Sequence, residues 1–98
     1  MNNSIDYKTN QWLKKIGINP KDLITSSLLL LQAERAAKWL TQHSLLYSSN
    51  DALLVRAFIE KTLKTKSRKK ITVSQAYKIL NLGTKARRKL YKIKRTGK

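Results

Sequence analysis

The feature of this sequence that most restricts its fold is the separation of charges along the chain. Residues 61–98 contain fifteen lysines and arginines and no acidic residue, whereas residues 1–60 contain seven basic residues and all five acidic ones. Because like charges repel one another and charged side chains are rarely buried, the second segment must keep most of its surface in solvent. We therefore expect residues 1–63 to form a weakly charged scaffold and residues 64–98 to form a strongly basic hairpin and tail.

The length of the chain predicts a single domain over residues 1–98, since so short a chain encloses only one modest hydrophobic core. Hydrophobic residues make up 41% of the sequence, close to the range of globular proteins, and the absence of cysteine excludes disulfides. The longest uninterrupted apolar run covers residues 28–31, and the N-terminus lacks the pattern of a secretory signal. We expect an intracellular protein, either cytoplasmic or nucleoid-associated.

Apolar residues recur at helical spacing through most of the first 63 residues. A first helix is predicted to begin after Ser4 and to end at Gly17, which would form a left-handed cap. The Asn-Pro-Lys-Asp segment at 19–22 is typical of a helix start, and the polar residues 25–27 predict a break before a further helix. The Ser-Ser-Asn-Asp segment at 48–51 predicts the start of the next helix.

The basic segment is predicted to form two short helices. Thr72 and Gln75 have the spacing of a capping box, which would begin the first of them. The Asn-Leu-Gly-Thr segment at 81–84 then interrupts the pattern. A final helix would dock through a narrow apolar stripe made of Ala86, Leu90 and Ile93. The expected fold is therefore an all-α bundle of about five helices with a basic C-terminal helical hairpin.

An alternative interpretation places two short strands in the same region. Apolar and polar residues also alternate over residues 70–73 and again over residues 90–95. Segments of this length satisfy both patterns, so the alternation alone does not decide between helix and strand.

Residues 71–93 resemble the helix-turn-helix of small DNA-binding regulators and of phage excisionase-like proteins. The resemblance consists of a capped first helix containing the small residue Ala76, a short turn and a basic second helix. It implies that the second helix enters the major groove of DNA. The sequence departs from the motif at Arg87, which occupies an expected apolar position when Asn81 and Leu82 fill the turn. The alternative is an ordinary helical hairpin with basic exposed faces.

The residue types of the basic segment predict contacts with nucleic acid. Lysine and arginine neutralise phosphates and release condensed counterions, and arginine also forms paired hydrogen bonds with guanine. Arg87 and Arg88 are therefore the first candidates for base recognition, with Gln75 and Asn81 as weaker ones. The candidate nucleic-acid-binding residues are Lys66, Arg68, Lys69, Lys70, Lys78, Lys85, Arg87, Arg88, Lys89, Lys92, Lys94 and Arg95.

Other residues in the sequence favour binding over catalysis. Tyr77 and Tyr91 lie within the basic segment, where they would either stack on unpaired bases or pack on the core. His43 is the only histidine, and the five carboxylates are scattered, so we expect neither an enzyme nor a metal or other cofactor. The stripe of the last helix contains neither tryptophan nor phenylalanine, which argues against membrane binding.

These observations predict a non-enzymatic nucleic-acid-binding protein. The first hypothesis is a small helix-turn-helix-like DNA-binding regulator or accessory factor, paired as a homodimer through residues 26–46. The alternative is a small helical subunit of a ribonucleoprotein that binds RNA or single-stranded DNA through the backbone. Small, basic, helical subunits of CRISPR effector complexes resemble this chain in size and charge.

Overall fold

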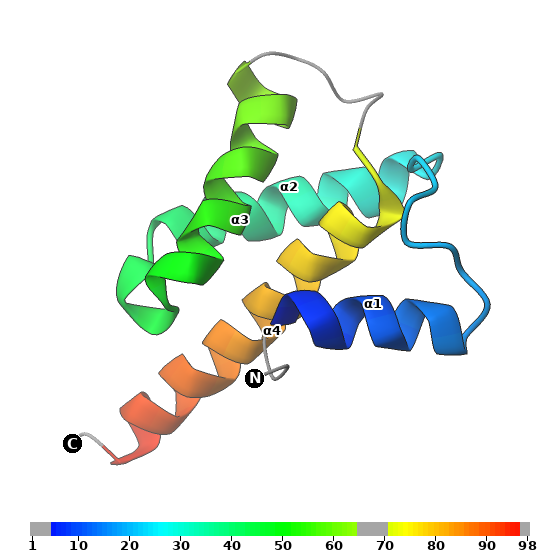
Figure 1. Cartoon of the computed structure of the whole chain (residues 1–98). Helices are drawn as coiled ribbons and strands as arrows, with labels where there is room; N and C mark the ends of the chain where they lie inside the picture. The colour runs from blue at the N-terminus through cyan, green and yellow to red at the C-terminus, as the bar shows by residue number, and fades with distance from the viewer. Residues whose placement is uncertain (1–4, 65–70, 97–98) are drawn as a thin grey trace.

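The computed structural model describes residues 5–64 and 71–96, which are helical almost throughout (Figure 1). Its elements are α1 (Ile5–Lys15), α2 (Ser27–Thr41), the 3₁₀ turn η1 (Ser44–Leu46), α3 (Ser49–Ile59), the π-helical turn η2 (Glu60–Lys64) and α4 (Val73–Thr96). The described part contains no strand, and its only isolated β-bridge pairs Leu23 with Thr72. The all-helical prediction is confirmed. The alternative with two strands is not supported, because α4 includes residues 90–95.

The core lies where α2, α3 and the first half of α4 meet, and α1 packs on α4 from another side (Figure 1). Its buried side chains from α2 are mostly small, whereas α3 and α4 contribute larger ones. The core residues are Ala33, Ala36, Ala37, Leu40, Val55, Phe58, Ile71, Ala76, Ile79, Leu82 and Ala86. The apolar face of α4 therefore belongs to the same core as the preceding helices.

The turn predicted at residues 81–84 is wrong, because α4 passes through this segment without a break. Ile79, Leu82 and Ala86 are all buried, and their spacing of three and four residues continues one helical face across the expected turn. Gly83 is also buried, and a Cβ atom at this position would lie 3.5 Å from the Cβ of Ala36 on α2. The glycine thus faces α2 within a continuous helix, and the basic hairpin is replaced by one long helix.

The helix start predicted at residues 19–22 is also wrong, since this segment forms a turn. The Asn19 side chain accepts a hydrogen bond from the Lys21 backbone at 3.0 Å, and the Asp22 amide donates to the Asn19 carbonyl at 3.1 Å. The chain then pairs with residues 71–73, where the Val73 amide donates to the Asp22 carbonyl. Since no helix begins at residues 19–22 and no turn divides α4, the described part has four α-helices where about five were expected.

Four other helix boundaries are confirmed. The Ser26 and Ser48 hydroxyls accept the backbone amides of Leu29 and Asp51, which caps α2 and α3. The predicted capping box is complete, because Thr72 and Gln75 exchange hydrogen bonds of 2.9 and 3.2 Å at the start of α4. Gly17 has a φ of 83° and follows α1 in a Schellman arrangement, with its amide bonded to the Lys14 carbonyl and that of Ile18 to the Leu13 carbonyl. Ser4 lies outside the described residues.

The two interpretations of Gly83 predict opposite effects of adding a methyl group. Within a continuous helix, Gly83→Ala removes a residue of low helix propensity, and the new Cβ would meet Ala36 at an ordinary contact distance. We expect the free energy of unfolding to rise by about 0.5–1 kcal/mol, measured by urea denaturation followed by circular dichroism. A clear loss of stability would indicate a turn at this position.

Gly17→Ala is the matched control for this experiment. Its left-handed backbone, with φ at 83°, is strained for alanine although no atom blocks the added Cβ. We expect this variant to lose roughly 1 kcal/mol. Equal effects of the two substitutions would contradict the different roles assigned to the two glycines.

Candidate nucleic-acid interface

The second half of α4 extends beyond the other helices (Figure 1). Its sequence carries a dense positive charge. We call its six exposed cations the basic segment: Lys85, Arg87, Arg88, Lys89, Lys92 and Lys94. Each was predicted from the sequence to contact nucleic acid. Arg95 lies within α4, but its side chain is outside the described part, and Lys66, Arg68, Lys69 and Lys70 also lie outside the described residues.

Lysines of α4 follow one side of the helix because the helix is continuous. Lys78, Lys85, Lys89 and Lys92 are separated by seven, four and three residues, which are spacings that return to nearly the same side of an α-helix. At a rise of 1.5 Å per residue, this lysine row extends over about 21 Å. In two short helices these lysines would have been divided between separate elements, so the tertiary structure creates the row.

Helix α1 covers the neighbouring side of α4 only over the first half of α4. The Asn81 amide donates to the Thr9 hydroxyl at 3.1 Å, and the Ser74 hydroxyl donates to Asn10 at 2.6 Å. Beyond Asn81 the charged side chains of the basic segment are exposed. The covered half of α4 is thus fixed to the scaffold, while the other half presents its charge.

The same packing decides the roles of three predicted base contacts. Tyr77 packs edge-on against Trp12, with ring centroids 5.3 Å apart, so this tyrosine is a packing residue. Gln75 accepts the Thr72 amide in the capping box, and Asn81 bonds to Thr9. These side chains are therefore used within the fold, whereas Tyr91 is 67% exposed among the cations.

Arg87 and Arg88 occupy different environments. The guanidinium of Arg87 lies 5.1 Å from the centre of the Trp39 ring, which in turn stacks on His43 at 4.0 Å. The Arg87 side chain also lines a groove of about 300 Å³ with Arg35 of α2. A cation over an aromatic face is held in place by the quadrupole of the ring. Arg87, although exposed, is therefore directed toward α2, and Arg88 is the other exposed arginine of the segment.

The predicted docking stripe of the last helix is shorter than expected. Ala86 is buried and Leu90 is partly buried, but Ile93 is 52% exposed. The reason is the length of α4, whose last turns lie beyond the other helices (Figure 1). Ile93 and Tyr91 thus leave apolar surface among the cations.

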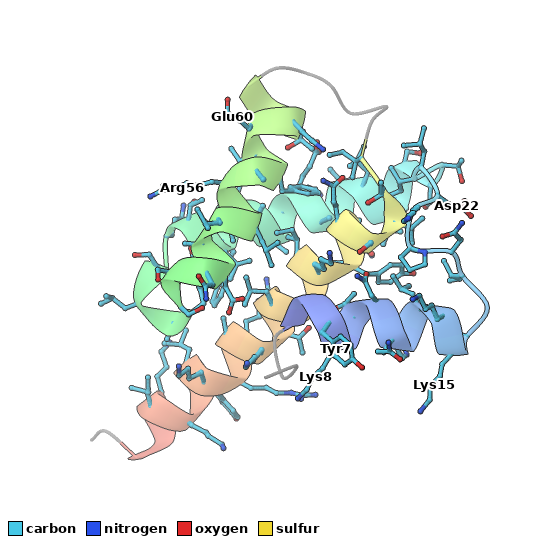
Figure 2. All side chains as sticks on the ribbon, viewed as in Figure 1. Tyr7, Lys8, Lys15, Asp22, Arg56 and Glu60 are labelled. Atoms are coloured by element: carbon cyan, nitrogen blue, oxygen red, sulfur yellow. The ribbon has the colours of Figure 1, made fainter. Side chains whose placement is uncertain are left out.

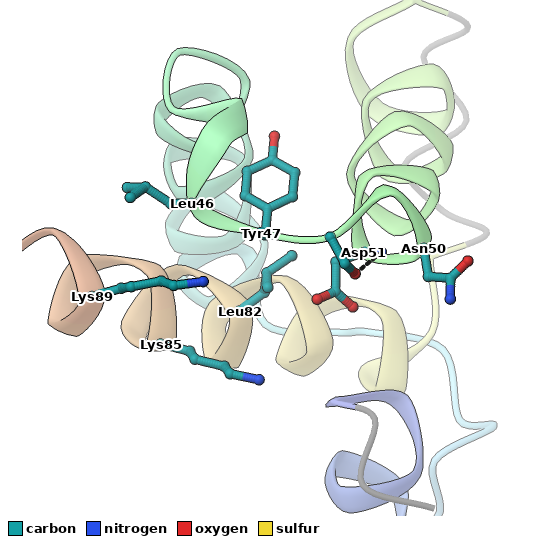
Figure 3. A pocket seen from close by; sticks show the side chains of 8 residues that line it. Leu46, Tyr47, Asn50, Asp51, Leu82, Lys85 and Lys89 are labelled. Carbon is teal, nitrogen blue, oxygen red and sulfur yellow. Dashed lines mark hydrogen bonds between the residues drawn. The ribbon is translucent and has the colours of Figure 1, made fainter. Parts of the chain in front are cut away.

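One carboxylate lies close to the lysine row. Asp51, in the first turn of α3, lines a cavity of about 290 Å³ together with Lys85, Lys89 and Tyr47 (Figure 3). The Asp51 amide is capped by Ser48, so the start of α3 fixes this acidic residue beside α4. Asp51 therefore adds one negative charge on this side of the row, and its Coulomb interaction with the lysines is attractive.

Sequence reasoning missed two basic residues of the scaffold. Lys14 of α1 and Lys21 of the following turn line one cleft with Lys78 of α4. No pattern along the chain brings these residues together, since more than fifty positions separate Lys21 from Lys78. The three lysines meet at one cleft because α1 packs across α4.

The chain matches no protein-family model, no curated protein and no solved structure. None of the helices in residues 5–64 and 71–96 combines the length and apolar character needed to cross a membrane. Within the same residues, no three histidine, aspartate or glutamate side chains form a group that would hold a metal ion. The role of the basic segment must therefore be inferred from its own charge and geometry.

Tyr47, which lines the cavity beside the lysine row, links this region to α2. Its hydroxyl donates a 2.6 Å hydrogen bond to the Leu40 carbonyl near the end of α2. Desolvation by burial raises the pKa of the Tyr47 phenol above its ordinary value of 10.0. The folded protein therefore favours the neutral phenol, whereas the unfolded chain ionises it near pH 10.

The Tyr47 interaction predicts a loss of stability at alkaline pH. Its contribution should be fully present below about pH 10 and should decrease as the pH rises above that value, because the unfolded state then binds fewer protons than the folded state. At pH 7, Tyr47→Phe should lower the free energy of unfolding by about 0.5–1.5 kcal/mol. Urea denaturation at pH 7, 10 and 11 should show this difference becoming smaller, and a constant difference would contradict the shifted titration.

Proposed function

We propose that this protein binds nucleic acid without catalysing a reaction, and that the basic segment of α4 is its principal contact. The observation that carries the proposal is the projection of one helix end with six exposed cations among ten residues. So high a density of positive charge repels itself in isolation, and a polyanion relieves that repulsion. Lysine and arginine would neutralise phosphates and release their counterions.

Duplex DNA is the preferred partner. A single α-helix has a diameter of about 10–12 Å with its side chains, which matches the roughly 12 Å width of the major groove of B-DNA. The lysine row would follow the phosphates along the groove, while Arg88 would reach toward base edges. This mode uses one long helix, so it differs from the helix-turn-helix expected from the sequence.

The dimer hypothesis concerns residues 26–46. Leu28 and Leu31 on α2 are exposed, and they supply apolar surface for pairing of two copies. Ala33, Ala37 and Leu40 of the same helix are buried within one chain, so pairing would use the opposite side of α2. Two copies related by a twofold axis would place two α4 helices on one duplex.

One observation favours a second candidate function, which is a ribonucleoprotein subunit that follows single-stranded RNA or DNA. Tyr91 is 67% exposed within the basic segment, and an exposed aromatic ring among cations is suited to stack on an unpaired base. Such a subunit would bind the backbone without recognising sequence. It would prefer single strands to duplexes, which the following experiment measures.

The test compares two variants that each remove two positive charges. Arg88→Gln with Lys89→Gln alters the basic segment, and Lys38→Gln with Arg56→Gln alters exposed residues of α2 and α3 as a control. Arg56 points outward from α3 (Figure 2). Binding is measured by fluorescence anisotropy with duplex DNA, single-stranded DNA and single-stranded RNA between about 50 and 200 mM salt, a range over which phosphate contacts weaken strongly.

We expect wild-type affinity to fall steeply with salt, and the α4 variant to bind roughly tenfold or more weakly than the control variant. Its slope of log affinity against log salt should also be smaller by about two, since each lost phosphate contact removes about one. Equal binding by the two variants would refute α4 as the contact. Preference for single strands, abolished by Tyr91→Ala, would favour the ribonucleoprotein subunit over the duplex-binding protein.

A further inference from the structure

A second basic site lies at the opposite end of α4 from the basic segment. It is a cleft of about 580 Å³ between α1, the turn at residues 19–22 and the start of α4. Lys14, Lys21 and Lys78 line it, one from each of these three parts of the chain. Since three cations from separate segments meet there, the cleft is a feature of the tertiary structure and not of one charged stretch.

The polar groups of the cleft add hydrogen-bond donors to these charges. Asn10 uses its side-chain oxygen to accept the Ser74 hydroxyl at 2.6 Å, and Asn19 uses its oxygen to accept the Lys21 amide at 3.0 Å. The side-chain oxygen of each asparagine thus accepts a hydrogen bond from the protein itself. The side-chain amide nitrogen carries two hydrogen-bond donors. Both asparagines line the cleft. Their amide groups, like the lysines, therefore favour a ligand that accepts hydrogen bonds.

The surroundings of the cleft suit an anion. The described residues that line it include no aspartate or glutamate. Asp22 follows Lys21 in the turn and is exposed, and its backbone carbonyl accepts the first amide of α4. The positive end of the α4 dipole points toward this region and adds to the potential of the lysines. Hydrogen-bond donors and positive charges therefore line the same concave surface.

The lysine row connects the cleft with the basic segment. Lys78 belongs to both, and the other members of the row, Lys85, Lys89 and Lys92, lead along α4 to its exposed end. The distance of about 21 Å along the helix axis corresponds to roughly six base pairs of B-DNA at 3.4 Å each. A strand lying along α4 would therefore meet both sites at once.

We propose that this cleft binds a phosphate group of the nucleic-acid backbone, as a second contact about six nucleotides from the contact made by the end of α4. The inference depends on the proposed function, because it assigns a further point of contact to the same ligand. It extends the interface to residues of the scaffold, and it gives Lys14, Lys21, Asn10 and Asn19 a role in binding. The phosphate would accept hydrogen bonds from the ammonium groups of Lys14 and Lys21 and from the two side-chain amides.

The test uses Lys14→Gln with Lys21→Gln, which removes two exposed charges of the cleft and leaves α4 unchanged. The Lys38→Gln, Arg56→Gln variant again serves as the control of equal net charge. Anisotropy is measured with a 5′-fluorescein duplex of about 16 base pairs, long enough to span both sites at the helical rise of DNA. Circular dichroism checks that each variant is folded.

We expect the cleft variant to bind roughly tenfold more weakly than the control variant, with a salt slope smaller by about one to two. In wild-type protein, the side-chain amide resonances of Asn10 and Asn19 should shift when the same duplex is added, and these shifts should be lost in the cleft variant. If the wild-type protein binds and the cleft and control variants have equal affinities, the cleft is not a phosphate contact, while the proposed function stands. Failure of the wild-type protein to bind any of the nucleic-acid probes would overturn the proposed function together with this inference.

Discussion

The close packing of α2 on α4 is the interaction on which the rest of the structure depends. Small residues of both helices meet there, and a Cβ added at Gly83 would lie 3.5 Å from that of Ala36, which is an ordinary contact distance. This contact covers the segment in which the sequence pattern alone allowed a turn, and helical spacing then continues from Ala76 to Ala86. One long helix follows, with its first half in the core and its second half in solvent. The apolar first half of α4 therefore stabilises the fold, and its basic second half presents positive charge to solvent.

The scaffold holds α4 at its start and leaves its end exposed. The carbonyls of Pro20 and Asp22 accept the amides of Ser74 and Val73, which satisfies backbone donors that a helix start would otherwise leave unpaired. Helix α1 adds side-chain hydrogen bonds to Ser74 and Asn81. Because these contacts lie at one end of α4, they draw the lysines of α1 and its following turn toward Lys78. Stabilisation of the helix and assembly of the proposed phosphate cleft therefore depend on the same packing.

Local signals in the sequence were sufficient where a boundary is decided by neighbouring residues. Each of these boundaries involves groups within five positions of one another. This holds for the serine caps, for the capping box at Thr72 and Gln75, and for the left-handed Gly17. Prediction failed where a residue has two physical uses. Asn19 and Pro20 suit a turn as well as a helix start, and Gly83 suits a close helix contact as well as a turn. In each case a distant segment decided the outcome, namely residues 71–74 for the first and α2 for the second.

By itself the sequence determined the all-helical fold and the concentration of positive charge in its last third, because side-chain periodicity and net charge are properties of the chain in any conformation. Six of the predicted cations do lie exposed on α4. Only the tertiary structure decided that Lys78, Lys85, Lys89 and Lys92 share one side of a helix, that Tyr77 and Asn81 are used in packing, and that Lys14 and Lys21 join the basic surface. The physical reason is that electrostatic and hydrogen-bonding contacts depend on distance in space, and the packing of α1 and α2 on α4 sets those distances.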